Sequence, residues 1–123
     1  MNPALDDIFA SINEMHITSI SDTSAVTEMT VSERHLNGVG VCQGGALFTL
    51  ADLAIAALTN RESKSVSTDA DIHFLAPARL GEHLICTCRM IRDGRHPFVN
   101  GEIRCENKLI ATFSGRDYKI EKL

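Results

Sequence analysis

Hydrophobic residues near the N-terminus recur at steps of three and four, which is the period of an amphipathic helix. A capping residue followed by a first-turn proline, Asn2-Pro3, stands at the start of this pattern. The pattern therefore predicts a short amphipathic helix. Its apolar positions are Leu5, Ile8, Phe9, Ile12 and Met15.

A second apolar stretch predicts the main helix of the chain. It begins at Ala46, reads ALFTLADLAIAALTN, and consists of strong helix formers without proline. The stretch is apolar on nearly every side, so we expect other elements to surround the helix. The glycine-dense segment HLNGVGVCQGG, which starts at His35, predicts a loop that leads into it.

The remaining segments are strand-like. Residues 16–31 are rich in Ile, Thr, Val and Ser, with Ser21-Asp22-Thr23 as the turn between two strands. Four further strand candidates follow Lys64. Their connections are too short for crossover helices, so the sheet should be mainly antiparallel. About six strands curling round one helix is the simplest arrangement of this α+β chain. The connections after Lys64 are 77–81, 93–96 and 106–108.

Length and composition narrow the class of protein. With 123 residues, 44% hydrophobic and 23% charged, the chain should form one domain over residues 1–123. A net charge of -4 without a basic cluster argues against a nucleic-acid surface. The acidic N-terminal segment does not resemble a signal peptide, which predicts a cytoplasmic protein. The longest apolar run, 46–58, is shorter than the roughly 20 residues that span a bilayer, so we expect no membrane insertion.

Four cysteines in a chain expected to be cytoplasmic indicate free thiols. Cys86 and Cys88 form a C-x-C pair that, with histidines, would suit a metal ion. The period of two in this segment instead places both on one apolar face with Leu84 and Met90. We therefore expect buried thiols and no metal.

Asp52 is the only ionisable residue between Gly45 and Arg61. A carboxylate on an apolar helix is desolvated, and desolvation raises its pKa toward values useful in acid-base catalysis. A role in the helix dipole does not explain it, because Asp52 lies two turns beyond the start of the helix. A salt bridge to Arg89 or Arg104 remains an open alternative.

Gly44 and Gly45 stand where the main helix begins. Backbone N-H groups at that position have no partner within the helix, so they could hold an oxyanion. A glycine pair there also fits a flexible entry or a close packing contact. The pair gains weight from Asp52 two turns later on the same helix, because a reacting carbonyl could rest at the helix N-terminus while Asp52 directs the attack on it.

Two longer segments carry a resemblance. They are HLNGVGVCQGGALFTLAD, residues 35–52, and VSTDADIHFLAPARLGE, residues 66–82. In content, order and spacing they resemble the phenylacetate-type (PaaI-like) acyl-CoA thioesterases of the hotdog superfamily, and the likeness extends from about His16 to the C-terminus. It implies the hotdog fold, in which a sheet wraps a central helix. It also implies a homodimer or a tetramer of paired dimers, with acyl-CoA bound at the subunit interface.

The same resemblance assigns roles to residues. It implies hydrolysis of an aryl- or medium-chain acyl-CoA to acid and CoA, with Asp52 as nucleophile or general base and the Gly44 N-H as oxyanion donor. Asn37 matches the position that holds the attacking water. Ser67, supplied by the partner chain, matches a residue facing the reacting centre. No cofactor is implied beyond the coenzyme A of the substrate.

Gln43 departs from the family pattern, which has His-Gly-Gly at the helix start. A glutamine amide can donate a similar hydrogen bond but cannot titrate. This substitution keeps open an alternative, a non-catalytic acyl-CoA-binding or assembly module of the same fold. A hydratase or dehydratase is disfavoured because the helix segment has no catalytic histidine.

Loop and late-strand arginines are candidates for the coenzyme A phosphates, although a solvated surface is the commoner role of any one of them. The candidate arginines are Arg79, Arg92, Arg95 and Arg116.

Farther along the second segment, Asp71 and His73 are expected to share a strand face with Ser67 and Asp69, as surface or interface groups.

Overall fold

The computed structural model describes residue 2 and residues 5–122. Its elements, in chain order, are α1 (Ile8–Ile12), β1 (His16–Ile20), β2 (Ser24–Thr30), the 3-10 helix η2 (Glu33–His35), α2 (Gly44–Thr59), β3 (Ser63–Phe74), β4 (His83–Arg92), β5 (Phe98–Cys105) and β6 (Lys108–Lys122).

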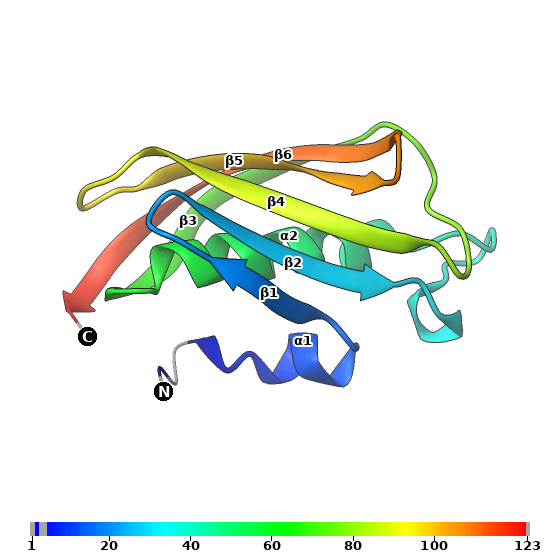
Figure 1. Cartoon of the computed structure of the whole chain (residues 1–123), viewed down its shortest axis with the longest axis horizontal. Helices are drawn as coiled ribbons and strands as arrows, with labels where there is room; N and C mark the ends of the chain where they lie inside the picture. The colour runs from blue at the N-terminus through cyan, green and yellow to red at the C-terminus, as the bar shows by residue number, and fades with distance from the viewer. Residues whose placement is uncertain (1, 3–4, 123) are drawn as a thin grey trace.

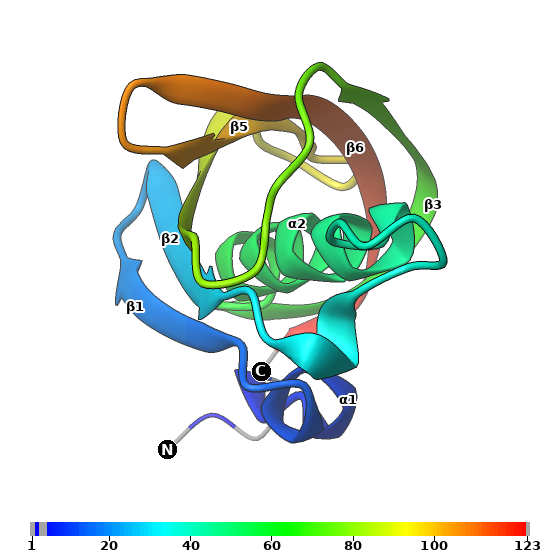
Figure 2. The same cartoon turned by 90° about the vertical axis from the view of Figure 1, so that its right-hand side faces the viewer.

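The strands form one six-stranded antiparallel sheet in the order β1-β2-β4-β5-β6-β3. The sheet curls around α2 (Figure 1, Figure 2). This confirms the predicted antiparallel sheet, the central helix and the turn at residues 21–23. None of the helices in the described part of the chain combines the length and apolar character needed to cross a bilayer.

The core lies between α2 and the inner face of the sheet. Leu50, Ile55 and Leu58 of α2 are fully buried against strand side chains such as Leu84 and Ile103. The four cysteines are free, and both members of the C-x-C pair are buried on this inner face, as predicted.

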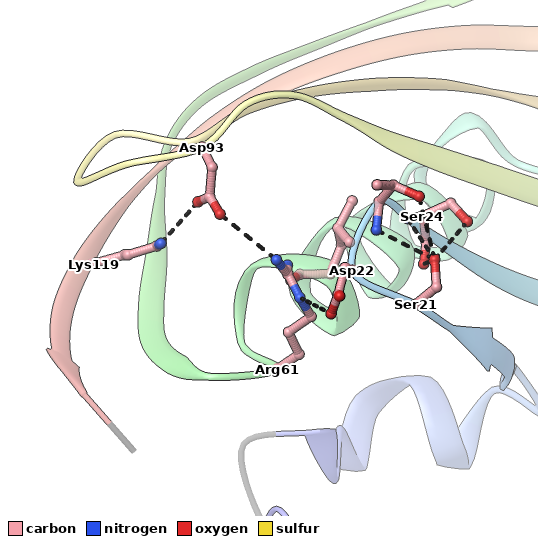
Figure 3. Close-up of polar contacts among 8 residues, drawn as sticks. Ser21, Asp22, Ser24, Arg61, Asp93 and Lys119 are labelled. Carbon is pink, nitrogen blue, oxygen red and sulfur yellow. Dashed lines mark hydrogen bonds and ion pairs between the residues drawn. The ribbon is translucent and has the colours of Figure 1, made fainter.

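The C-terminal end of α2 is tied to two strand turns by Arg61 (Figure 3). Its guanidinium pairs with Asp93 of the β4–β5 turn at 3.6 Å and with Asp22 of the β1–β2 turn at 3.9 Å. Lys119 of β6 binds the same Asp93 carboxylate at 2.8 Å. These contacts fix the end of the helix relative to the sheet.

The N-terminal helix differs from its prediction. It begins at Ile8 and is capped by the Asp7 carboxylate, which accepts the Ala10 N-H at 3.0 Å. The α-helix thus starts later than the expected Asn2-Pro3 cap. The Asn2 amide donates to the Asn60 carbonyl, and Pro3 lies outside the described residues. Ala10 is buried, but Ile8, Phe9 and Ile12 remain largely exposed.

Strand β3 forms one edge of the sheet and contains a bulge. Ser67 pairs with Asp117 of β6, whereas the next register pair joins Asp69 to Arg116, so Thr68 is an extra residue. Asp117 is buried on the inner face, and Arg116 is exposed on the outer face. The bulge therefore turns Ser67 toward the inner face of the sheet.

This bulge corrects the expectation that Ser67, Asp69, Asp71 and His73 share one face. Beyond the bulge, Asp69 and Asp71 point outward, where Asp71 accepts a hydrogen bond from Ser114 at 3.1 Å. His73 lies beside Asp71 on that outer face. Alternation with a period of two fails here because one residue is inserted.

Candidate active site

Asp52 lies on the face of α2 that the sheet leaves open. Helix α1 lies on that side of α2 (Figure 2). Between the two helices is a cleft of about 360 Å³, lined by Asp7, Phe9, Gly45, Phe48, Thr49 and Asp52. The expectation that α2 is surrounded on all sides is therefore wrong for this face of the single chain, because the six strands do not close around it.

The protein around Asp52 favours the protonated form of its carboxyl group, compared with an aspartate in water. Its side chain reaches solvent in the single chain. Even so, desolvation by the surrounding protein raises its pKa, and the negative charges of Asp117 and Asp7 raise it further. Within residues 2 and 5–122, Asp52 forms no ion pair with Arg89, Arg104 or any other cation, and Arg104 pairs instead with Glu102. The alternative of a salt bridge to Arg89 or Arg104 therefore does not explain Asp52.

Gly44 borders a second cleft, of about 470 Å³, at the start of α2. The ring of Phe74, at the end of β3, lies so close to Gly44 that an added Cβ would be 2.9 Å from its Cζ. As the first residue of the helix, Gly44 has no acceptor for its N-H within α2. The close packing alternative is thus real, and it coexists with a free backbone donor.

Asn37 lines the same cleft as Gly44. Its Oδ1 accepts the backbone N-H groups of Val39 and Val41 at 3.0 and 3.2 Å, so the loop fixes the orientation of the carboxamide. Its side-chain NH2 has no partner among the described residues and remains available to a ligand. Asn37 and Gly44 are thus brought together, as predicted, while Asp52 lines the other cleft.

Gln43 precedes α2 in an extended conformation and makes no side-chain capping hydrogen bond. Its Oε1 lies over Gly45, where an added Cβ would approach it to 2.9 Å. Gln43 and Gly45 also line a further cleft of about 410 Å³, which includes Arg34 and shares Phe9 with the Asp52 cleft. Gln43 therefore borders the site without contacting Asp52.

The candidate coenzyme A arginines do not form one cluster in the single chain. Arg79 lies on the β3–β4 connection, which contacts the segment before α2 through the bond from Cys42 N-H to Ala78 O. Arg95 lies on the β4–β5 turn and stacks on Tyr118. Arg116 pairs with Asp69 on the outer face of the sheet. Arg92 ends β4.

Sequence patterns did not single out the aromatic lining of these clefts. Phe48 lies one turn before Asp52 on the same helix face, a spacing that could have indicated it. Phe9 and Asp7 reach the cleft only because α1 folds back onto α2.

Within residues 2 and 5–122, no group of three or more His, Cys, Asp or Glu side chains is arranged to hold a metal ion.

Comparison with known proteins decides the family. The model of the thioesterase superfamily matches residues 39–109. The chain belongs to the thioesterase superfamily. Acyl-coenzyme A thioesterase PaaI of Escherichia coli K12 is 32% identical over 118 residues, which cover 94% of this chain and 84% of that protein. Human acyl-coenzyme A thioesterase 13 is 32% identical over 87 residues, 68% of this chain and 62% of that protein.

Solved structures of this superfamily confirm the hotdog fold. The E. coli PaaI protein from the phenylacetic acid degradation operon superposes with a TM-score of 0.89 at 32% identity, covering 95% of this chain and 87% of that one. The smu.793 protein of Streptococcus mutans UA159, solved with acetyl CoA, has a TM-score of 0.84 at 21% identity and covers 89% of this chain and 90% of that one. At that identity the second match shows the shared fold.

Proposed function

We propose that this chain hydrolyses the thioester of an aryl- or medium-chain acyl-CoA, with Asp52 as the catalytic carboxylate. The observation that carries the proposal is Asp52 itself. It is a desolvated carboxylate with raised pKa, without a cation partner among the described residues, in a cleft lined by Phe9 and Phe48. Such a group can attack the thioester carbonyl or accept a proton from water. The named thioesterases among its relatives support the same reaction.

The site takes residues from two chains. Gly44 and Asp52 are eight residues apart on α2, which corresponds to about 12 Å of helix axis. A reacting carbonyl must lie about 3 Å from both its oxyanion donor and its attacking group. One helix cannot meet both requirements, so the same-helix arrangement expected from the sequence is replaced in this proposal. Asp52 of one chain works with Gly44 and Asn37 of its partner. The free edge of β3 offers the surface for pairing the two sheets.

Ser67 belongs in this proposal to the same chain as Asp52. The resemblance placed it on the partner chain. However, Ser67 faces Asp117, and the charge of Asp117 reaches Asp52 within one chain. This neighbourhood favours Ser67 and Asp52 acting together from one chain, opposite Gly44 and Asn37 of the other. Ser67 then contacts the attacking water, and Asn37 holds it from the partner side.

Gln43 takes the place of the family histidine as a hydrogen-bond donor, because its amide NH2 has a similar reach. The CoA phosphates are anionic, and Arg79 is the candidate closest in the fold to the start of α2. Arg95 and Arg116 lie farther from it and would act from the partner chain. Acetyl CoA in the S. mutans neighbour supports a CoA ligand for this fold.

The replacement of histidine by Gln43 supports one alternative, an acyl-CoA-binding module without turnover. Release of thiol from a panel of acyl-CoAs, followed with a chromogenic thiol reagent, separates the two functions. The wild type should release CoA, and Asp52→Asn should lower kcat by a factor on the order of 100 or more while still binding acyl-CoA. Asp71→Asn, on the outer face, serves as the matched control. Turnover by Asp52→Asn at the wild-type rate would refute Asp52 as the catalytic carboxylate.

A further inference from the structure

A second carboxylate, that of Asp117, is buried and lies outside the site described so far. It is only 3% exposed, on the inner face of β6. Its Oδ2 accepts the Thr59 hydroxyl at 2.7 Å, but its Oδ1 is buried and has no hydrogen-bond partner among the described residues. An unsatisfied buried acceptor destabilises the fold, and such groups are uncommon in native proteins. Its retention therefore calls for a functional explanation.

The neighbour of Asp117 across the sheet is Ser67, which the bulge at Thr68 turns to the inner face. Without this extra residue, Ser67 would point outward with Asp69. Burial raises the pKa of Asp117, and the hydroxyls of Thr59 and Ser67 partly oppose that effect. Two separate features, the bulge and the buried acid, thus place a hydroxyl donor beside an acceptor that lacks one.

We propose that Asp117 is a positioning residue whose Oδ1 accepts a hydrogen bond from the Ser67 hydroxyl, so that Ser67 presents only an acceptor oxygen to the reacting centre. A serine hydroxyl has one proton to donate and two lone pairs. With its O–H directed at Asp117, the Ser67 oxygen accepts a hydrogen bond from one O–H of the attacking water, while Asp52 accepts one from the other. This inference rests on the proposed function and adds the residue that fixes the direction of the Ser67 hydroxyl.

Three substitutions at two positions test the hydrogen bond. Asp117→Leu keeps the branched arrangement of heavy atoms, with methyl groups in place of the smaller oxygens, and removes both acceptors. Thr59 can turn its hydroxyl to a carbonyl of its own helix. Asp117→Asn keeps an acceptor oxygen. We expect Asp117→Leu to lower kcat as much as Ser67→Ala, with little change in KM, and the double variant to be no slower than either single variant. Asp117→Asn should retain most of the wild-type kcat.

Stability separates this role from a purely structural one. Because Asp117→Leu replaces a desolvated, buried carboxylate with an apolar side chain, its melting temperature should equal or exceed that of the wild type. If the leucine does not fit, Asp117→Ala removes the acceptor instead. Ser114→Ala is the matched control, since it breaks a serine–aspartate pair between the same two strands on the outer face and should leave kcat unchanged.

Crossing the variants locates the effect on one chain. Heterodimers of Asp117→Leu with Gly44→Pro should recover activity, and those of Asp117→Leu with Ser67→Ala should not. The inference is overturned by a wild-type kcat in Asp117→Leu, by losses that multiply in the Ser67→Ala double variant, or by Asp117→Asn as slow as Asp117→Leu. Those results would leave the proposed function standing, whereas full activity of Asp52→Asn would overturn the proposed function itself, so the two failures are distinguishable.

Discussion

Replacing Gly44 by proline removes the proposed oxyanion donor from the backbone while keeping the helix. Gly44 is the first residue of α2, where proline is well tolerated because its missing N-H has no partner within the helix. Gln43 before it has φ -63° and ψ 141°, which is the extended conformation that a residue preceding proline prefers. Gly44→Pro should therefore fold as the wild type does.

The expected loss follows from the chemistry of the oxyanion. Removing one preorganised donor typically lowers kcat by about 10² to 10³, or roughly 3 to 4 kcal/mol of transition-state stabilisation. Gly44→Ala is the matched control. Its Cβ meets the same Phe74 ring at 2.9 Å, but it keeps the N-H. Phe74 is 54% exposed and free to turn aside, so the alanine variant should lose far less activity.

Thiol release from a saturating acyl-CoA gives kcat for both variants, and thermal unfolding checks that α2 is intact. The account requires a large loss in Gly44→Pro and a small one in Gly44→Ala at similar melting temperatures. If the two variants were equally active, the Gly44 N-H would not be the oxyanion donor.

Three further predictions follow from the site and the core. Because the pKa of Asp52 is raised, lowering the pH should reduce activity at pH values above those at which an ordinary aspartate is protonated. Asp7→Asn should shift this loss of activity to lower pH, and an unchanged pH profile would contradict the charge effect. Gln43→His should keep or raise kcat and Gln43→Ala should lower it moderately, whereas an inactive wild type rescued by histidine would favour the binding module. Gly101→Ala should destabilise the fold by more than about 2 kcal/mol in urea unfolding, because its Cβ would lie 2.0 Å from the Thr87 carbonyl oxygen; unchanged stability would refute that packing.

Much of the fold could be predicted from local patterns. The apolar run from Ala46 specifies a buried helix, and turn residues such as those at 21–23 mark the strand ends. Asp52 stands out in the sequence as well, because it is the single acid in that apolar helix. These features depend on neighbours along the chain, which a sequence displays directly.

Other parts depend on residues distant in sequence. Nothing in the residues around Thr68 marks the bulge that turns Ser67 inward, because its cause is the register with β6. Asp117 follows Arg116 in a charged segment that looks solvated, yet the curl of the sheet buries it against Thr59. Phe9 likewise enters the Asp52 cleft only through the packing of α1.

Complementation between two inactive variants tests most directly whether the site is shared between chains. In a mixed dimer of Asp52→Asn and Gly44→Pro, one site carries both lesions and the other carries neither. After subunit exchange, verified heterodimers should recover activity approaching half the wild-type value per dimer, although each parent is nearly inactive. If those heterodimers recover nothing, or if the wild-type protein is a fully active monomer at the assay concentration, the shared site is wrong.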